Sequence, residues 1–126
     1  MLVLDLDETL VHYKEQDGES KVLFRPYLDE FLEEMNKYFE IMIFTASVEE
    51  YADLILNHLD PNNNIITKRF YRKDTVLINN EYTVKDLLKI ERDLKKIIIV
   101  DNLPDNFKHQ PDNGIFIDSW YGEEND

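Results

Sequence analysis

Short apolar runs alternate along the chain with stretches in which apolar residues recur every three or four positions. Residues 1–4, 41–44 and 97–100 are runs of four apolar residues, a length typical of buried strands, and each is followed by polar residues. Over residues 28–39 and 48–59 the apolar positions follow the spacing 0, 3, 4, 7 and 11, which predicts two helices that each bury one face. The pattern therefore predicts a chain in which strands and helices alternate.

Weaker signals complete the set of predicted elements. Ser47 and Glu50 fit a capping box, with Ser47 as the N-cap of the second helix and Glu50 at its third position, and this helix should end before Pro61. Asn79 and Asn80 tolerate a positive φ, so they suit the tight turn of a hairpin. Five further runs are strand-like: 21–24, 68–72, 75–78, 82–84 and 115–117. With no internal repeat or linker, this order predicts a single α/β domain, a sandwich with a mainly parallel central sheet.

The composition excludes several classes of protein. With 43% hydrophobic residues the 126-residue chain can bury a core, but no apolar run exceeds four residues, so we expect neither a transmembrane helix nor a secretory leader. The absence of cysteine excludes disulfides, thiolate nucleophiles and cysteine-bound metal clusters. Only three glycines are present, and no glycine-rich phosphate loop or dinucleotide fingerprint occurs.

The charge is strongly acidic and unevenly distributed. A net charge of −13 argues against general binding to nucleic acids or anionic membranes. Residues 68–96 nevertheless carry nine of the 14 basic residues and five acidic ones, so this segment has a net charge of +4 while the remainder carries −17. Two interpretations remain open at this point: the basic segment receives an anion, or it forms a solvated face of helices and turns.

Three of the predicted strands end in polar residues at the edge where open α/β sheets bind their ligands. Asp5 and Asp7 follow the first strand, Thr45 follows the second, and Asp101 and Asn102 follow the third. Because residues i and i+2 of an extended segment point to one side, the two aspartates can face one pocket, and two carboxylates with an amide oxygen suit Mg²⁺. Thr45 offers a hydroxyl and a backbone N–H to a phosphate, near the N-terminus of the next helix.

Each of these residues alone has an ordinary structural explanation. Asp5 and Asp7 could cap the turn after their strand, Ser47 could serve only as a helix cap, and Lys85 could be an exposed lysine. Their joint occurrence at strand ends, with Lys85 in a turn between the second and third strands, favours a functional site.

The order of these residues resembles that of the haloacid dehalogenase superfamily of phosphotransferases. The stretch DLDETLV at residues 5–11 resembles its first motif, the strand that ends in Thr45 its second, Lys85 its third, and Asp101 with Asn102 its fourth. More closely, the chain is similar to the FCP/SCP-type phosphatases, also called NLI-interacting-factor-like or C-terminal-domain small phosphatase-like proteins. The segments that carry this similarity are LDLDETLVH (4–12), RP (25–26), FTAS (44–47), VKDL (84–87), VDNLP (100–104), PDN (111–113) and SW (119–120). The resemblance implies a Rossmann-like sandwich with helices on both faces of the sheet, without a cap domain and with small hairpin or flap insertions.

The resemblance also implies an aspartate-based phosphoryl transfer. Asp5 would be the nucleophile that takes the phosphoryl group as an aspartyl phosphate. Asp7 would protonate the leaving oxygen and then activate the water that hydrolyses the intermediate. Mg²⁺ would be held by the Asp5 carboxylate, the Asp7 backbone carbonyl and Asn102.

Five further residues have implied roles around the phosphoryl group. Thr45 and Lys85 would bind the transferring group, and Asp101 would orient Lys85 or a metal-bound water. Thr9 and Arg72 would contact the substrate, and Arg72 matches an arginine that follows an aromatic residue in the family.

The lengths of the connecting segments predict an open site. Residues 11–24 are the only ones between Leu10 and Arg25, which leaves room for a flap or hairpin but not for a cap domain. An open site suits a phosphorylated protein or peptide, and the resemblance implies the RNA polymerase II C-terminal domain as a substrate and a nuclear or cytoplasmic location. Another phosphoprotein stays open, because the family's longer β-stranded insertion, with its apolar pocket for a substrate proline, is reduced here to Val22, Leu23 and Phe24.

Two alternative functions are disfavoured by the sequence. A non-catalytic binding protein on the same fold, similar to a mitochondrial import receptor, is disfavoured because the candidate aspartates and Lys85 are intact. A phospho-accepting signalling receiver is disfavoured because Lys85 precedes Asp101, whereas receivers have their lysine last.

The chain stops just after Gly122, where family members usually continue into a further helix, so residues 1–126 are either a trimmed domain or one that has lost its terminal segments.

Overall fold

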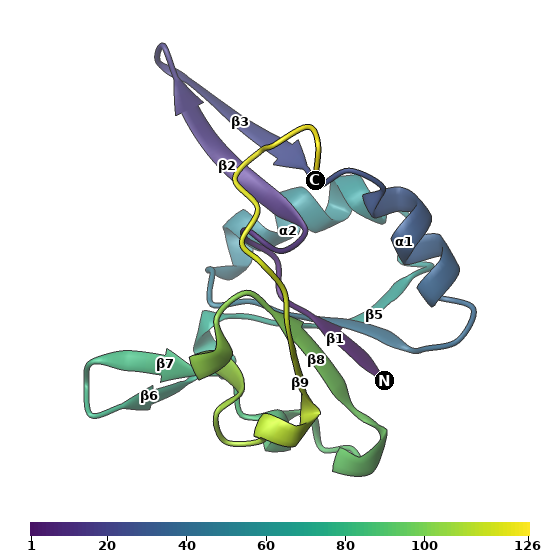
Figure 1. The fold of residues 1–126 in the computed structure, drawn as a ribbon, viewed down its shortest axis with the longest axis vertical. Helices are drawn as coiled ribbons and strands as arrows, with labels where there is room; N and C mark the ends of the chain where they lie inside the picture. Colours follow the sequence, from purple (N-terminus) through teal and green to yellow (C-terminus); the bar gives the residue numbers. More distant parts are fainter.

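A five-stranded parallel sheet forms the centre of the computed structural model, which describes all of residues 1–126 (Figure 1). Its strands lie in the order β5-β4-β1-β8-β9, and every neighbouring pair is parallel. Their bounds are β1 (Leu2–Leu4), β4 (Ile41–Phe44), β5 (Ile66–Phe70), β8 (Ile98–Asp101) and β9 (Gly114–Phe116). The prediction of an α/β fold with a mainly parallel sheet is confirmed. β1 lies in the middle, so the residues that follow it emerge at the centre of the sheet edge.

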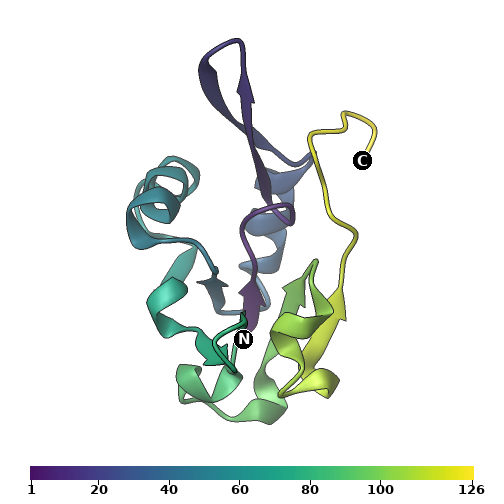
Figure 2. The same cartoon turned by 90° about the vertical axis from the view of Figure 1, so that its left-hand side faces the viewer.

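The two faces of the sheet are covered unequally (Figures 1 and 2). The α-helices α1 (Leu28–Met35) and α2 (Glu49–Leu59) pack on one face, over a core that includes Leu4 and Ile43. On the other face Val3 and Met42 pack against short 3₁₀ helices. The 3₁₀ helices of the chain are η1 (Arg72–Asp74), η2 (Leu87–Ile90), η3 (Leu94–Lys96), η4 (Pro104–Phe107) and η5 (Pro111–Asn113). No helix is both long and apolar enough to cross a bilayer.

Two antiparallel hairpins are the only insertions, and there is no cap domain. The first, β2 (Val11–Gln16) with β3 (Glu19–Phe24), projects beyond the helical layer (Figure 2). The second, β6 (Val76–Ile78) with β7 (Tyr82–Val84), turns through Asn79 and Asn80, whose φ values of 54° and 57° confirm the predicted asparagine turn.

Several predicted boundaries differ from the structure for local reasons. The first helix ends at Met35 instead of continuing to Phe39, because residues 36–39 form a turn that folds Phe39 back onto the same core. β5 lies two residues earlier than predicted, since the chain turns into η1 after Tyr71. The predicted capping box is wrong: the N-cap of α2 is Val48, without a side-chain hydrogen bond, and the Ser47 hydroxyl is engaged elsewhere.

Candidate active site

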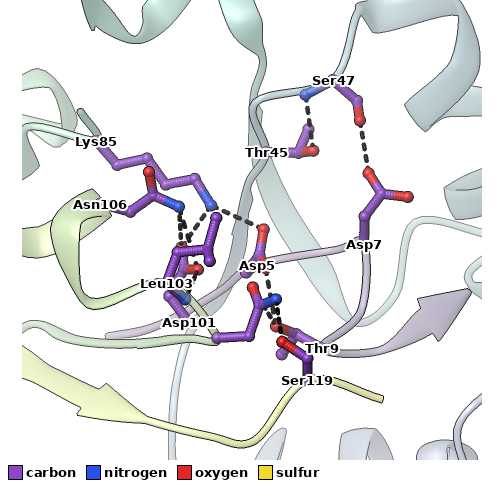
Figure 3. Close-up of polar contacts among 11 residues, drawn as sticks. Asp5, Asp7, Thr9, Thr45, Ser47, Lys85, Asp101, Leu103, Asn106 and Ser119 are labelled. Atoms are coloured by element: carbon purple, nitrogen blue, oxygen red, sulfur yellow. Dashed lines mark hydrogen bonds and ion pairs between the residues drawn. The ribbon is translucent and has the colours of Figure 1, made fainter. Parts of the chain in front are cut away.

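The carboxyl ends of the parallel strands bring the candidate residues together at one edge of the sheet (Figure 3). Asp5 directly follows β1, Thr45 follows β4, and Asp101 ends β8. Lys85 comes from outside the sheet, directly after β7, and enters the same region. Residues far apart in the sequence therefore converge because their strands are neighbours.

Lys85 is the electrostatic centre of the site. Its side chain is only 1% exposed, and its Nζ donates to Asp5 Oδ1 over 2.7 Å and to Asp101 Oδ2 over 2.6 Å. Asp101 is also fixed by the Asn106 amide, at 3.2 Å from both carboxylate oxygens, and by the backbone N–H of Leu103 at 3.0 Å. One buried cation thus serves two buried carboxylates, which leaves the cluster with an excess negative charge.

The excess negative charge is reflected in the pKa values of Asp5 and Lys85. Burial raises the pKa of the Asp5 carboxyl to about 6, although the Lys85 ammonium and the Thr9 hydroxyl act to lower it. Burial opposes the charged form of Lys85, but the two carboxylates outweigh it and hold the pKa of this ammonium above its usual value. Lys85 therefore stays protonated, and Asp5 would be more readily ionised beside a second positive charge.

Asn102 and Asp5 fit a divalent cation. Hydrogen bonding within the protein favours the Asn102 amide nitrogen facing the carboxylates, where it donates to Asp5 Oδ2 at 2.8 Å and to Asp101 Oδ1 at 3.1 Å while its oxygen accepts from Ser119. In the opposite orientation the amide oxygen lies near the same two carboxylate oxygens, and a bound cation would compensate that arrangement. No cluster of three histidine or carboxylate side chains forms a metal site, so the donor set depends on an amide and a backbone carbonyl. The Asp7 carbonyl, which accepts no hydrogen bond, suits the latter role.

Asp7 lies apart from this cluster. Its Oδ2 accepts from the Ser47 hydroxyl and its Oδ1 from the Tyr51 hydroxyl, both at 2.6 Å (Figure 3 shows the Ser47 contact). Asp7 lines an open groove, whereas Asp5 is buried and is not among the residues that line it. The two aspartates are thus on the same loop but in different environments, one held by a lysine and the other by hydroxyl groups.

Thr9 and Thr45 are placed differently from the sequence-based expectation. Thr9 is buried, and its hydroxyl donates to Asp5 Oδ2 at 2.8 Å, so it orients the carboxylate instead of facing the groove. The Thr45 backbone N–H donates to the Phe70 carbonyl and is not available to a phosphate. The Thr45 hydroxyl oxygen accepts from the Ser47 N–H at 3.0 Å, which leaves its own proton free to donate.

Three of the nine basic residues in the segment 68–96 form ion pairs with acidic residues from elsewhere in the chain. The pairs are Arg69 with Asp53, Lys73 with Glu49, and Arg92 with Glu40. Arg72 has no carboxylate partner: its Nε donates to the Ala46 carbonyl at 2.8 Å, and its side chain lines the groove. The segment thus contributes Lys85 to the buried cluster and Arg72 to the lining of the groove.

The groove beside Asp7 has a volume of about 450 Å³ and a partly aromatic wall. The residues that line it are Asp7, Glu8, His12, Tyr13, Ser47, Val48, Tyr51, Arg72 and Tyr121. Sequence reasoning missed the contribution of Tyr51, which occupies a core position in the helical pattern, and that of Asn106, which no pattern distinguishes. The hydrogen bonds from Ser47 and Tyr51 to Asp7 could not be predicted from the sequence either, because they depend on how α2 lies against the loop after β1.

Comparisons with known proteins agree on one family. The family model described as NLI interacting factor-like phosphatase matches residues 1–126. The chain is 45% identical to CTD small phosphatase-like protein 2 of Dictyostelium discoideum, over 99% of this chain and 24% of that protein. It is 42% identical to CTD small phosphatase-like protein 3 of Caenorhabditis elegans, over 99% and 49%, and 35% identical to CTD nuclear envelope phosphatase 1 of Xenopus tropicalis, over 100% and 61%. The chain thus spans between about a quarter and three fifths of these relatives.

A solved structure supports the fold. The RNA polymerase II CTD phosphatase Fcp1-R271A of fission yeast, bound to beryllium fluoride, superimposes with a TM-score of 0.76 at 17% identity, over 94% of this chain and 41% of that one. At this level of identity the similarity concerns only the fold of the matched part.

Proposed function

Because the chain belongs to the NLI interacting factor-like phosphatases, we propose that it is a Mg²⁺-dependent phosphatase for phosphoserine and phosphothreonine in proteins, with Asp5 as the nucleophile. The observation that carries the proposal is the buried contact of Asp5 with Lys85, at 2.7 Å, directly beside the Asn102 amide. A carboxylate that is fixed next to a permanent cation suits attack on a phosphoryl group, whose transfer depends mainly on positioning and charge neutralisation.

The first half of the reaction transfers the phosphoryl group to the protein. A bond forms between phosphorus and an Asp5 carboxylate oxygen while the bond from phosphorus to the serine or threonine oxygen breaks, and Asp7 gives that leaving oxygen a proton. Lys85 and the free hydroxyl proton of Thr45 bind the phosphoryl oxygens, and Arg72 contacts the substrate at the groove mouth. Thr9 and Asp101 hold Asp5 and Lys85 in place through the contacts at 2.8 Å and 2.6 Å.

The second half releases phosphate. Asp7 takes a proton from a water molecule whose oxygen attacks phosphorus, and the bond between phosphorus and Asp5 breaks to give inorganic phosphate and the free carboxylate. The Asp5 carboxylate, the Asn102 amide oxygen and the Asp7 carbonyl would hold Mg²⁺, which when bound supplies positive charge to the phosphoryl oxygens. The two aspartates thus have separate tasks, in agreement with their different surroundings.

The open groove supports a protein or peptide as the substrate. No cap domain encloses the site, and the groove of about 450 Å³ is open to solvent beside Asp7, with Tyr13 and Tyr121 on its walls. The structural neighbour is named as a phosphatase of the RNA polymerase II CTD, and we propose that tail as one candidate substrate among phosphoproteins.

Hydrolysis of p-nitrophenyl phosphate, with Mg²⁺ or with a chelator, tests the chemistry. We expect wild-type turnover that requires Mg²⁺ and is lost in Asp5→Asn, with circular dichroism spectra that show both proteins folded. A panel of phosphopeptides then identifies the substrate. If the folded wild type hydrolyses neither kind of substrate, the proposal is wrong and the chain is better described as a binding protein on the phosphatase fold.

A further inference from the structure

The carboxylate of Asp7 is held from both sides by hydroxyl groups that make no other side-chain hydrogen bond. Ser47 Oγ donates to Oδ2 and Tyr51 OH donates to Oδ1, each over 2.6 Å. This distance lies in the short range of hydrogen bonds from a hydroxyl to an ionised acceptor, which are about twice as strong as neutral ones. Burial and the Asp7 carboxylate both raise the pKa of the Tyr51 phenol, so that hydroxyl remains a donor.

Both donors belong to the start of α2 and not to the strand that carries the catalytic loop. Ser47 lies two residues before the helix and Tyr51 lies in its first turn, and the hydroxyl groups of both reach Asp7. The Tyr51 ring packs against the core and contacts Tyr13 edge-on, with 6.1 Å between ring centroids. The orientation of Asp7 is thus set by α2 and the loop that leads into it, while that of Asp5 is set by Lys85 and Thr9.

Resting on the proposed function, we propose that Ser47 and Tyr51 are positioning residues that orient the Asp7 carboxylate for proton transfer. The two parts of Tyr51 then have separate tasks, because its ring belongs to the groove wall and its hydroxyl to Asp7. Contacts that a substrate makes with the ring affect binding, whereas the hydroxyl affects turnover. α2 is accordingly part of the catalytic apparatus and not only a cover of the sheet.

The second half of the reaction should depend most on this orientation. The attacking water must give its proton to Asp7 as its oxygen bonds to phosphorus, and a misplacement of about 1 Å can cost as much as 100-fold in rate. In the first half, p-nitrophenolate is stable enough to leave without a proton. Loss of either hydroxyl should therefore slow release of phosphate from Asp5 more than it slows formation of the phosphoryl bond.

Rapid-mixing kinetics with p-nitrophenyl phosphate and Mg²⁺ separate the two halves in the wild type, Tyr51→Phe, Ser47→Ala and Ser47→Thr. For the first two variants we expect a first turnover at the wild-type rate, followed by a steady-state rate that is about tenfold lower. KM should fall by about the same factor, because kcat/KM depends only on the unchanged first half of the reaction. Ser47→Thr retains a hydroxyl and should restore the steady-state rate. Thermal unfolding of each variant shows whether it is folded at the assay temperature.

Tyr71→Phe provides a matched control. The Tyr71 hydroxyl also donates to a carboxylate, that of Asp53, over 2.6 Å, but it lies outside the groove. We expect its kinetics to equal those of the wild type. Equal kinetics in Tyr51→Phe and Ser47→Ala, or a change confined to KM, would overturn the positioning role while leaving the phosphatase proposal intact. A wild type without Asp5-dependent turnover would instead overturn the proposed function itself.

Discussion

Replacement of Asp5 by asparagine should abolish turnover and yet stabilise the protein in the presence of a chelator. In the wild type, two buried carboxylates share the single ammonium of Lys85. The substitution removes one negative charge, leaves the pair of Lys85 and Asp101 at 2.6 Å, and changes the side-chain volume little. The oxygen of the new amide can still accept a hydrogen bond from Lys85. The nitrogen of the new amide can donate to the Asn102 side-chain oxygen if the Asn102 amide flips.

The pKa of Asp5 sets the size of the expected stabilisation. Burial raises it from 3.8 to about 6, and each pKa unit corresponds to about 1.4 kcal/mol, so the ionised carboxyl costs the folded state at most about 3 kcal/mol. Because the pKa in the folded state is raised, the native protein binds more protons than the unfolded chain between about pH 4 and pH 6. The wild type therefore loses stability as the pH rises through this window, and the full cost is present above it.

Thermal unfolding in a chelator at about pH 4 and about pH 7.5 measures the prediction. Above pH 6 we expect Asp5→Asn to melt roughly 3–9 °C higher than the wild type, for a stabilisation of about 1–3 kcal/mol in a domain of this size. At about pH 4 the difference should shrink towards zero. Addition of Mg²⁺ should raise the Tm of the wild type more than that of the variant. A variant that melts below the wild type at pH 7.5, or an advantage that does not change with pH, would refute the reasoning.

Three further substitutions should lower the free energy of unfolding, measured by urea titration of the intrinsic fluorescence. Lys85→Met leaves two buried carboxylates without a cation and should cost about 3–5 kcal/mol, and a cost below about 1 kcal/mol would contradict the buried pairing. Asp60→Ala removes the acceptor of the backbone N–H groups of residues 64–66 and should cost about 2–4 kcal/mol, whereas Asp60→Asn should cost less. Gly114→Ala drives a methyl group into the Phe107 ring and should cost about 1–3 kcal/mol unless the ring can shift.

The strands of the sheet could be predicted because their signal is local. Runs such as 41–44 are buried on both faces, so every residue is apolar, and the residue after each run marks the edge where ligands bind. β2 was not predicted as a strand for the opposite reason. Beyond Val11 and His12 its residues are exposed, and they are held mainly by pairing with β3. Extended hairpins of this kind leave little periodicity in the sequence.

The sequence predicted that several of these residues meet at one edge of the sheet, but not the contacts that they make there. Asp5, Lys85 and Asn102 come together as expected, since parallel strands bring their carboxyl ends to one edge. The role of Ser47 could not be predicted, because a serine before a helix suits a cap and a side-chain ligand equally well, and only the tilt of α2 decides between them. Tyr51 likewise combines core packing with a polar contact, and periodicity detects only the first.

The site also draws its residues from nearly the full length of the chain. The contact between Lys85 and Asp5 spans 80 positions, and β1 acquires its partner β8 only when a loop of more than 90 residues closes. Contacts between residues that are so far apart in the sequence form late and slowly in folding. During refolding from urea, catalytic competence should consequently return only with the slowest phase, after helical circular dichroism has recovered. On the ribosome, Asp5 emerges 80 residues before Lys85, so its carboxylate stays without its cationic partner until Lys85 is also free.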